Sequence, residues 1–180
     1  MNIQEAKKIL ENAEVITSAD NIQKTLDQMA NQINTEYENR YPLVLTVMGG
    51  ALIYSGQLLP KITTVLDNDY LHVSRYGDET KGGKLIWIAT PRSSILGRDV
   101  LVLDDILDEG ITLTNIKKHL LDNGAKSCKF AVLCEKEIGK EKPISADFVG
   151  FKLPNRFVFG FGMDIYGIWR NLPEIYALKE

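Results

Sequence analysis

The sequence predicts an α/β protein in which a mainly parallel sheet is covered by helices on both faces. Short and almost wholly apolar runs, such as residues 43–47 and 100–103, have the length and composition of strands that are buried on both faces. Segments with helical spacing of apolar residues alternate with these runs along the chain. The chain has 180 residues, of which 44% are hydrophobic, and this suffices for one core. We therefore expect a single domain over residues 1–180.

The N-terminal part of the chain is expected to form two helices, over residues 3–13 and 18–39. In the second helix, either Ser18 or Asp20 is placed to cap the first turn. Apolar side chains recur along it at helical spacing and predict a buried face, formed by Ile22, Leu26, Met29, Ala30 and Ile33. The two helices would either cover the sheet or form an interface between subunits.

The rest of the chain is expected to alternate between strands and helices. A strand at 43–47 leads into Gly49 and Gly50, and a helix over 51–59 should stop near Pro60. Four further strands are predicted, over residues 63–75, 84–90, 99–103 and 127–133. A second helix is predicted over residues 112–123, where Gly124 supplies a stop, and short strands follow in the tail from Asp147.

Composition and charge exclude several classes of protein. A formal net charge of −3, from 21 basic and 24 acidic side chains, argues against a nucleic-acid partner. No run approaches the roughly 20 apolar residues of a membrane span, and the N-terminus has no apolar signal core. Cys128 and Cys134 are expected to be buried, reduced thiols, and His72 and His119 to be structural or exposed. We expect a cytoplasmic protein.

The stretch of the sequence that carries chemistry follows the strand at 99–103. This strand ends in Asp104 and Asp105, and two more acidic residues with a Gly-x-Thr turn follow at 108–112, where the next helix begins. In open α/β sheets, ligands bind beyond the carboxyl ends of the strands. The start of a helix suits a phosphate, and adjacent carboxylates suit hydroxyl groups or a divalent cation. The stretch therefore predicts a site for a sugar phosphate.

Residues 100–113 resemble the signature of type I phosphoribosyltransferases, which bind phosphoribosyl pyrophosphate (PRPP). The tail narrows this resemblance to the hypoxanthine-guanine branch, through Lys136 and the segments 147–150, 156–160 and 162–173. The resemblance implies the fold of that family, a mainly parallel sheet with helices on both faces plus a small hood subdomain. Residues 1–40 and 147–180 would then form the hood and the base-binding parts.

The resemblance assigns PRPP to the end of the strand and the turn that follows it. Asp104 and Asp105 would hold the ribose hydroxyls and help to orient a magnesium–PRPP complex, and Asp108 would be the general base at purine N7. Backbone N–H groups of the turn would bind the 5′-phosphate, at Glu109, Gly110, Ile111 and Thr112. Pyrophosphate would meet the loop formed by Met48, Gly49 and Gly50.

The purine and the leaving group are assigned to the tail by the same resemblance. Lys136 would donate to the 6-oxo group and so select oxopurines over adenine, whose amino group would meet it donor to donor. Phe157 would stack on the base, and the backbone of Val158 would contact its pyrimidine edge. Asp164 would ligate magnesium (Mg²⁺) beside the base, and Arg170 would bind pyrophosphate.

Two positions depart from the family pattern. Met48 stands where many members have a lysine, and Arg75-Tyr76 stands where a Ser-Tyr pair is common in the mobile loop. A lid is expected over residues 74–84, where it would exclude water from the cation-like transition state.

The function implied is the Mg²⁺-dependent transfer of a 5-phosphoribosyl group from PRPP to hypoxanthine or guanine. IMP or GMP and pyrophosphate would be the products. Two alternatives remain open at this point: a regulatory protein of the same fold that senses PRPP or nucleotides, and a xanthine-preferring enzyme. The resemblance also implies a homodimer or homotetramer.

Overall fold

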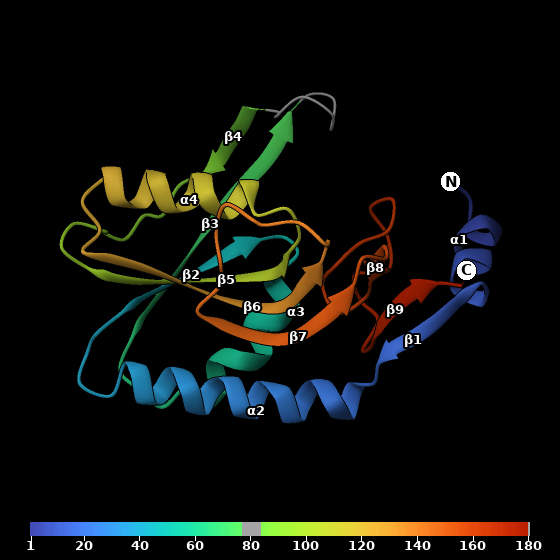
Figure 1. Ribbon diagram of the computed structural model, residues 1–180, viewed down its shortest axis with the longest axis horizontal. Coiled ribbons are helices and arrows are strands. Elements are labelled where there is room, and N and C mark those ends of the chain that lie inside the picture. Colours follow the sequence, from blue (N-terminus) through green and yellow to red (C-terminus); the bar gives the residue numbers. More distant parts are fainter. Residues whose placement is uncertain (77–83, 180) are drawn as a thin grey trace.

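A six-stranded sheet, with the strand order β4-β3-β2-β5-β6-β7, forms the centre of the computed structural model, which describes residues 1–76 and 84–179 (Figure 1). Its strands are β2 (Leu43–Met48), β3 (Asp67–Tyr76), β4 (Lys84–Ala89), β5 (Asp99–Leu107), β6 (Ser127–Glu137) and β7 (Phe148–Pro154). Neighbouring strands run parallel except for β3 and β4, which are antiparallel. The predicted mainly parallel sheet is confirmed.

Helices cover both faces of this sheet, as the sequence predicts. The helices α2 (Ala19–Glu36) and α3 (Leu52–Leu58) lie on one face, and α4 (Ile111–Asp122) lies on the other (Figure 1). The short 3-10 helix η1 (Leu59–Lys61) follows α3. Ser18 is the residue that caps α2, because its hydroxyl accepts a hydrogen bond from the Asn21 N–H at 3.4 Å. All five apolar residues predicted for the buried face of α2 are buried.

A second, smaller sheet forms the hood and joins the two ends of the chain. It is antiparallel, with the strand order β1-β9-β8, and comprises β1 (Ala13–Thr17), β8 (Val158–Phe159) and β9 (Ile175–Leu178). The helix α1 (Ile3–Glu11) precedes β1, and both ends of the chain lie beside this sheet (Figure 1). The sequence analysis did not predict β1, because its pairing partner lies more than 150 residues away.

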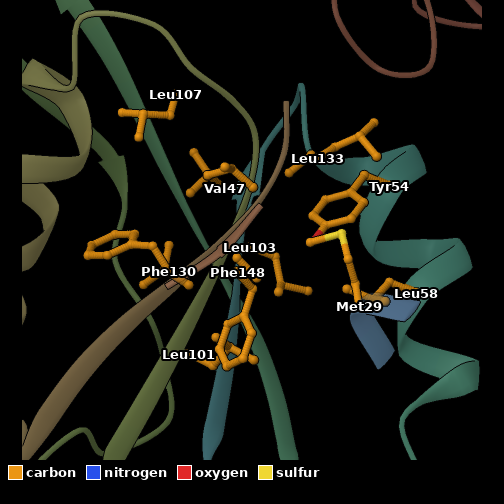
Figure 2. Packing of buried hydrophobic residues seen from close by; sticks show 14 of the residues in the cluster. Met29, Val47, Tyr54, Leu58, Leu101, Leu103, Leu107, Phe130, Leu133 and Phe148 are labelled. Carbon is orange, nitrogen blue, oxygen red and sulfur yellow. The ribbon is translucent and has the colours of Figure 1, made fainter. Parts of the chain in front are cut away.

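The core lies between the large sheet and its covering helices. Figure 2 shows Tyr54 of α3 next to Met29 of α2, and the Tyr54 hydroxyl contacts the Met29 sulfur at 3.9 Å. Side chains from the central strands complete the packing, among them Val47, Leu101, Leu103, Phe130 and Leu133. Cys128 and Cys134 are free and buried in this core, which confirms their predicted state.

The boundaries of three predicted strands are wrong. β3 begins at Asp67, four residues later than predicted, because the backbone N–H of Thr63 donates to the Asn34 side chain of α2 at 2.8 Å instead of to a strand. β5 continues from 103 to Leu107, and β6 continues from 133 to Glu137. These extensions are paired with each other in parallel register up to Leu107 and Glu135. Asp104 and Asp105, the first two carboxylates of the signature, therefore lie within the part of β5 that is paired with β6.

The lid predicted over residues 74–84 lies mostly outside the described residues, as do the side chains of Arg75 and Tyr76. No helix in the part of the chain that the structure describes is long and apolar enough to cross a membrane.

Candidate active site

A cavity of about 390 Å³ lies beyond the carboxyl ends of β2 and β5. It is lined by residues that the sequence analysis assigned to PRPP, namely Met48, Gly49, Gly50, Asp104, Asp105, Asp108, Gly110 and Thr112. Asp164 and Arg170, from the segment between β8 and β9, complete its wall. The parallel arrangement of β2 and β5 produces this meeting, because both strands end at the same edge of the sheet.

Asp104 and Asp105 are consecutive carboxylic acids, of which the first is buried and the second half-buried. Burial raises the pKa of Asp104 well above its ordinary range, and the charge of Asp105 adds to this effect. Burial also raises the pKa of Asp105. Local backbone donors satisfy part of the pair, since Asp104 Oδ1 accepts from the Asp105 N–H at 3.0 Å and Asp105 Oδ1 accepts from the Ile106 N–H at 2.8 Å. Further hydroxyl donors or a cation would stabilise both carboxylates.

The loop after β2 passes directly against this acidic pair. The peptide bond between Met48 and Gly49 is cis. A Cβ atom at Gly50 would overlap the carboxylate of Asp105, so a larger residue there would displace that side chain. Gly162 is restricted in the same way, because a Cβ atom on it would overlap the carbonyl oxygen of Gly50 and its φ is +105°. The backbone of the loop is thus packed between β5 and the tail.

The turn after β5 ends in a left-handed residue that starts α4. Gly110 has a φ of +83° and occupies the N-cap position of this helix, which begins at Ile111. The first backbone N–H groups of a helix have no acceptor within the helix, and its dipole is positive at this end. Gly110 and Thr112 line the cavity, whereas Glu109 pairs with Lys140 at 3.0 Å. The geometry of the turn fits the predicted phosphate site.

Asp108 and Lys136 meet at the rim of a smaller, adjoining cavity of about 150 Å³. Lys136 Nζ donates to Asp108 Oδ2 at 2.7 Å, and only 11% of the Lys136 side chain is exposed. The aromatic ring predicted to stack on the base belongs to Phe157, which lines this cavity and is 57% exposed. Val158 also lines it. The cavity therefore combines a carboxylate, an ammonium group and an accessible ring.

Asp164 and Arg170 form a second charged pair across the site. Arg170 Nη2 lies 2.6 Å from Asp164 Oδ1, and Asp164 Oδ2 accepts from the Gly167 N–H at 2.7 Å. Arg170 Nη1 also donates to the carbonyl oxygen of Gly162 at 2.6 Å. These bonds hold the carboxylate of Asp164 and the guanidinium of Arg170 together at the wall of the larger cavity.

The donor set fits a magnesium ion that is held jointly with a substrate. Asp104, Asp105 and Asp164 supply carboxylate oxygens to one cavity, and oxygen ligands are those that magnesium prefers. Among residues 1–76 and 84–179, no three metal-ligating side chains converge on one point. Magnesium usually keeps several ligands from water or from substrate phosphates, so phosphate oxygens could share its coordination with these carboxylates.

Sequence reasoning missed two parts of this site. His72 and Ser74 of β3 line the larger cavity, although His72 was expected to be structural or exposed. They arrive there because β3 runs parallel to β2, with His72 paired to Met48. The segment of residues 138–146 was also missed. It packs, through Ile144 near Gly110, against the phosphate turn, which is the turn of residues 108–110 that joins β5 to α4. The register of the sheet could have indicated the first of these, but no sequence signal indicated the second.

Comparison with known proteins agrees with the fold. The family model of the phosphoribosyl transferase domain matches residues 12–165. Fold and site therefore define a phosphoribosyltransferase domain.

Its relatives narrow the class further. The hypoxanthine-guanine phosphoribosyltransferase of Bacillus subtilis is 38% identical over 166 residues, which are 92% of each chain. A crystal structure of a hypoxanthine phosphoribosyltransferase from Staphylococcus aureus superposes with a TM-score of 0.88 at 30% identity, covering 99% of this chain and 96% of that one. The chain belongs to the hypoxanthine-guanine phosphoribosyltransferase family.

One group of relatives is much longer. The bifunctional protein TilS/HprT of Listeria monocytogenes is 40% identical over 166 residues, which are 92% of this chain and 26% of that protein. The chain thus corresponds to about a quarter of the length of this relative.

Proposed function

We propose that this chain transfers the 5-phosphoribosyl group of PRPP to hypoxanthine or guanine in purine salvage, with release of pyrophosphate. The observation that carries the proposal is the pair of Asp108 and Lys136 at the rim of the small cavity, one carboxylate and one ammonium group 2.7 Å apart. N7 and the 6-oxo group of an oxopurine are neighbours on one edge of the base. The Asp108 carboxylate can accept the N7 proton and the Lys136 ammonium group can donate to the 6-oxo oxygen, and their separation matches that edge.

The purine would replace the contact between Asp108 and Lys136 by one hydrogen bond to each of them. Asp108 would accept the proton from N7 as the new bond to ribose forms, and Lys136 would donate to the 6-oxo oxygen. Adenine presents an amino group at the same place, so that Lys136 would meet a donor and the base would be rejected. Phe157 would stack on the face of the ring, and the Val158 backbone would contact its pyrimidine edge.

PRPP would occupy the larger cavity. The ribose hydroxyls would donate to Asp104 and Asp105, which would relieve the repulsion between these buried carboxylates. The backbone of residues 109–112 at the start of α4 would bind the 5′-phosphate. Arg170 and the loop of Gly49 and Gly50 would hold pyrophosphate. Met48 is apolar and adds no charge at the place where many family members have a lysine, so Arg170 would carry more of this task.

Magnesium would be held by Asp164 together with the phosphates of PRPP. When bound, it would neutralise the charge that develops on the leaving pyrophosphate. The Asp164 carboxylate is paired with Arg170 at 2.6 Å. Binding of magnesium–PRPP would therefore separate the pair and give each partner an oppositely charged group of the complex.

The family membership also supports two properties of the whole protein. We propose a cytoplasmic enzyme that assembles as a homodimer or homotetramer. Light scattering coupled to size-exclusion chromatography would measure the mass, and a single monomer peak at assay concentration would contradict the assembly.

A base panel tests the proposed reaction. The pure protein is incubated with PRPP and magnesium, and hypoxanthine, guanine, xanthine, adenine and orotate are offered separately while nucleotide and pyrophosphate are followed. We expect rapid formation of IMP and GMP that a chelator abolishes. Preference for xanthine would change the assigned base. Binding of PRPP or nucleotide without turnover of any base would refute the enzyme and favour a regulatory protein.

A further inference from the structure

Lys142 is a buried lysine outside the residues assigned to PRPP or the purine. Only 9% of its side chain is exposed. Its ammonium group donates to the carbonyl oxygen of Lys136 at 2.6 Å and to that of Leu107 at 3.0 Å, and it lies 3.4 Å from the carboxylate of Glu135. Lysine is almost never buried unless it is paired, and here three acceptors match its three donors.

The position of these acceptors is informative. The parallel pairing of β5 with β6 ends at Leu107 and Glu135. Lys142 bonds to the carbonyl of Leu107 and to the carbonyl of the residue after Glu135, so its ammonium group connects the two strands just beyond the end of their pairing. A hydrogen bond from a charged donor is stronger than one from a neutral donor. The lysine therefore continues the connection between β5 and β6 where the ladder no longer supplies one.

The bonds of Lys142 lie next to Asp108 and Lys136, the two residues that are proposed to bind the purine. Asp108 directly follows Leu107, and Lys136 is itself the second residue whose carbonyl Lys142 binds. The side chains of Asp108 and Lys136 are joined at 2.7 Å. The same segment also supports the phosphate turn, because a Cβ atom at Gly110 would lie 3.0 Å from Ile144 and 3.4 Å from Pro143.

We propose that Lys142 is a positioning residue that sets the spacing of Asp108 and Lys136 for the purine edge. It acts on the backbones of both strands and lines neither the larger nor the smaller cavity. The inference deepens the proposed function and rests on it, since the spacing matters only if these two side chains bind one base. Lys140 of the same segment differs, because its pair with Glu109 is at the surface and 63% of its side chain is exposed.

The test compares two lysines changed in the same way. Lys142→Met removes the three donors and keeps a flexible apolar chain, while Lys118→Met is the matched control on α4, where the side chain is 74% exposed and pairs with Asp122 at the surface. We expect Lys142→Met to raise the KM for hypoxanthine roughly tenfold, and to change the KM for PRPP by less than about twofold. Lys118→Met should leave both constants unchanged. Equal losses toward both substrates would contradict a role confined to the purine.

A double-mutant cycle separates positioning from a general loss of stability. In a Lys136→Met background there is no ammonium group left to position, so adding Lys142→Met should change the apparent affinity for hypoxanthine by about twofold at most. A full tenfold effect in both backgrounds would overturn the proposal. If Lys142→Met does not fold, the same cycle is run with Lys142→Gln, which retains two donors and should show a smaller effect of the same kind. Wild-type turnover is measured alongside, so a failure of the proposed reaction is distinguished from a failure of this role.

Discussion

Asp108 and Lys136 present a carboxylate and an ammonium group in direct contact. Their 2.7 Å contact orients the Lys136 side chain, of which only 11% is exposed. Under the proposed function, a purine that bonds to both partners would compensate the loss of their mutual contact, whereas a base with the wrong pattern of donors would separate the pair without replacing it. Discrimination would then arise from the cost of breaking this contact.

Asp108→Asn removes the proposed base and keeps its shape. We expect turnover to fall by about 10²–10³ while the affinity for PRPP changes little, because the amide cannot take the N7 proton. Steady-state kinetics with hypoxanthine, together with calorimetric binding of magnesium–PRPP, would measure the two effects. Wild-type turnover in this variant would remove Asp108 from the mechanism.

Asp104→Asn tests the electrostatic cost of the acidic pair. An amide at this position cannot be charged, and it removes the repulsion that burial intensifies between Asp104 and Asp105. We expect the free protein to become more stable at pH 7, by about 1–2 kcal/mol in the free energy of unfolding, and to lose activity. Urea unfolding without ligands measures the first effect. A lower stability would show that the charge of Asp104 is well compensated in the free protein.

Asp99 at the start of β5 gives a pH-dependent prediction away from the site. The Ser127 hydroxyl donates to its carboxylate at 2.6 Å and Lys126 adds a surface charge, so the pKa of Asp99 is held below its ordinary value of 3.8. A lowered pKa in the folded state stabilises the protein above pH 3.8, and this contribution is lost as the pH falls through the folded value. We expect Asp99→Asn to cost about 1 kcal/mol near neutral pH. The difference from wild type should shrink steadily below pH 3.8, and a constant difference would contradict the assignment.

Individual residues were predictable where a local pattern determines their place. The spacing of the acidic residues, Gly110 and Thr112 between an apolar strand and a helix is such a pattern, and the structure brings all of them except Glu109 to one cavity. His72 and Lys142 have no comparable signal. His72 reaches the cavity through the pairing of β3 with β2, and Lys142 is significant only because of two carbonyl groups that its own sequence neighbourhood does not reveal.

At the scale of the elements, the close contact of α2 with β7 makes a testable contrast between two glycines. A Cβ atom at Gly150 of β7 would come within 3.1 Å of the Met29 sulfur and the Thr25 methyl group, and it would crowd the Leu133 carbonyl. Gly56 lies within α3, is exposed, and has no atom within 4 Å of the corresponding position.

The same substitution should therefore have opposite effects at these positions. We expect Gly150→Ala to destabilise the protein by about 1–3 kcal/mol, because the added methyl group would displace the backbone of β6 at Leu133 and crowd α2. Gly56→Ala should stabilise it by about 0.5–1 kcal/mol, since alanine favours a helix more than glycine does. Thermal unfolding of both variants measures the contrast, and equal shifts in one direction would refute the proposed crowding.

Elements were predictable in kind and less so in extent. Apolar patterns predicted whether α2 and the central strands are helical or extended. A helix buried on one face repeats its apolar residues at helical spacing, and a strand buried on both faces is a short apolar run. The ends depend on partners that lie far away in the chain. β5 continues through two aspartates because β6 supplies its hydrogen bonds as far as Leu107, and β1 exists only because β9 returns beside it. Intrinsic preference could not reveal either feature.

At the scale of the whole molecule, ligand binding should connect the large sheet, α4 and the tail. Residues from β2, β5, the start of α4 and the segment before β9 all line one cavity. We expect magnesium–PRPP at about 100 times its Kd to stabilise the fold by about 2.7 kcal/mol, which corresponds to a rise in Tm of roughly 5–10 °C. Differential scanning fluorimetry measures this rise. Addition of a chelator should remove most of it, and a rise that is independent of magnesium would contradict the proposed role of the ion.

The antiparallel pairing of β1 with β9 determines how the molecule would respond to a pulling force. Ala13 is paired with Leu178, so both ends of the chain leave the small sheet on the same side. Tension between them opens the strands one hydrogen bond at a time, which resists much less than sliding whole strands past each other. Asp164 and Arg170 lie between β8 and β9, and they would be the first parts of the site to lose their support. The phosphate turn is anchored on central β5, and it would remain in place until the large sheet itself gives way.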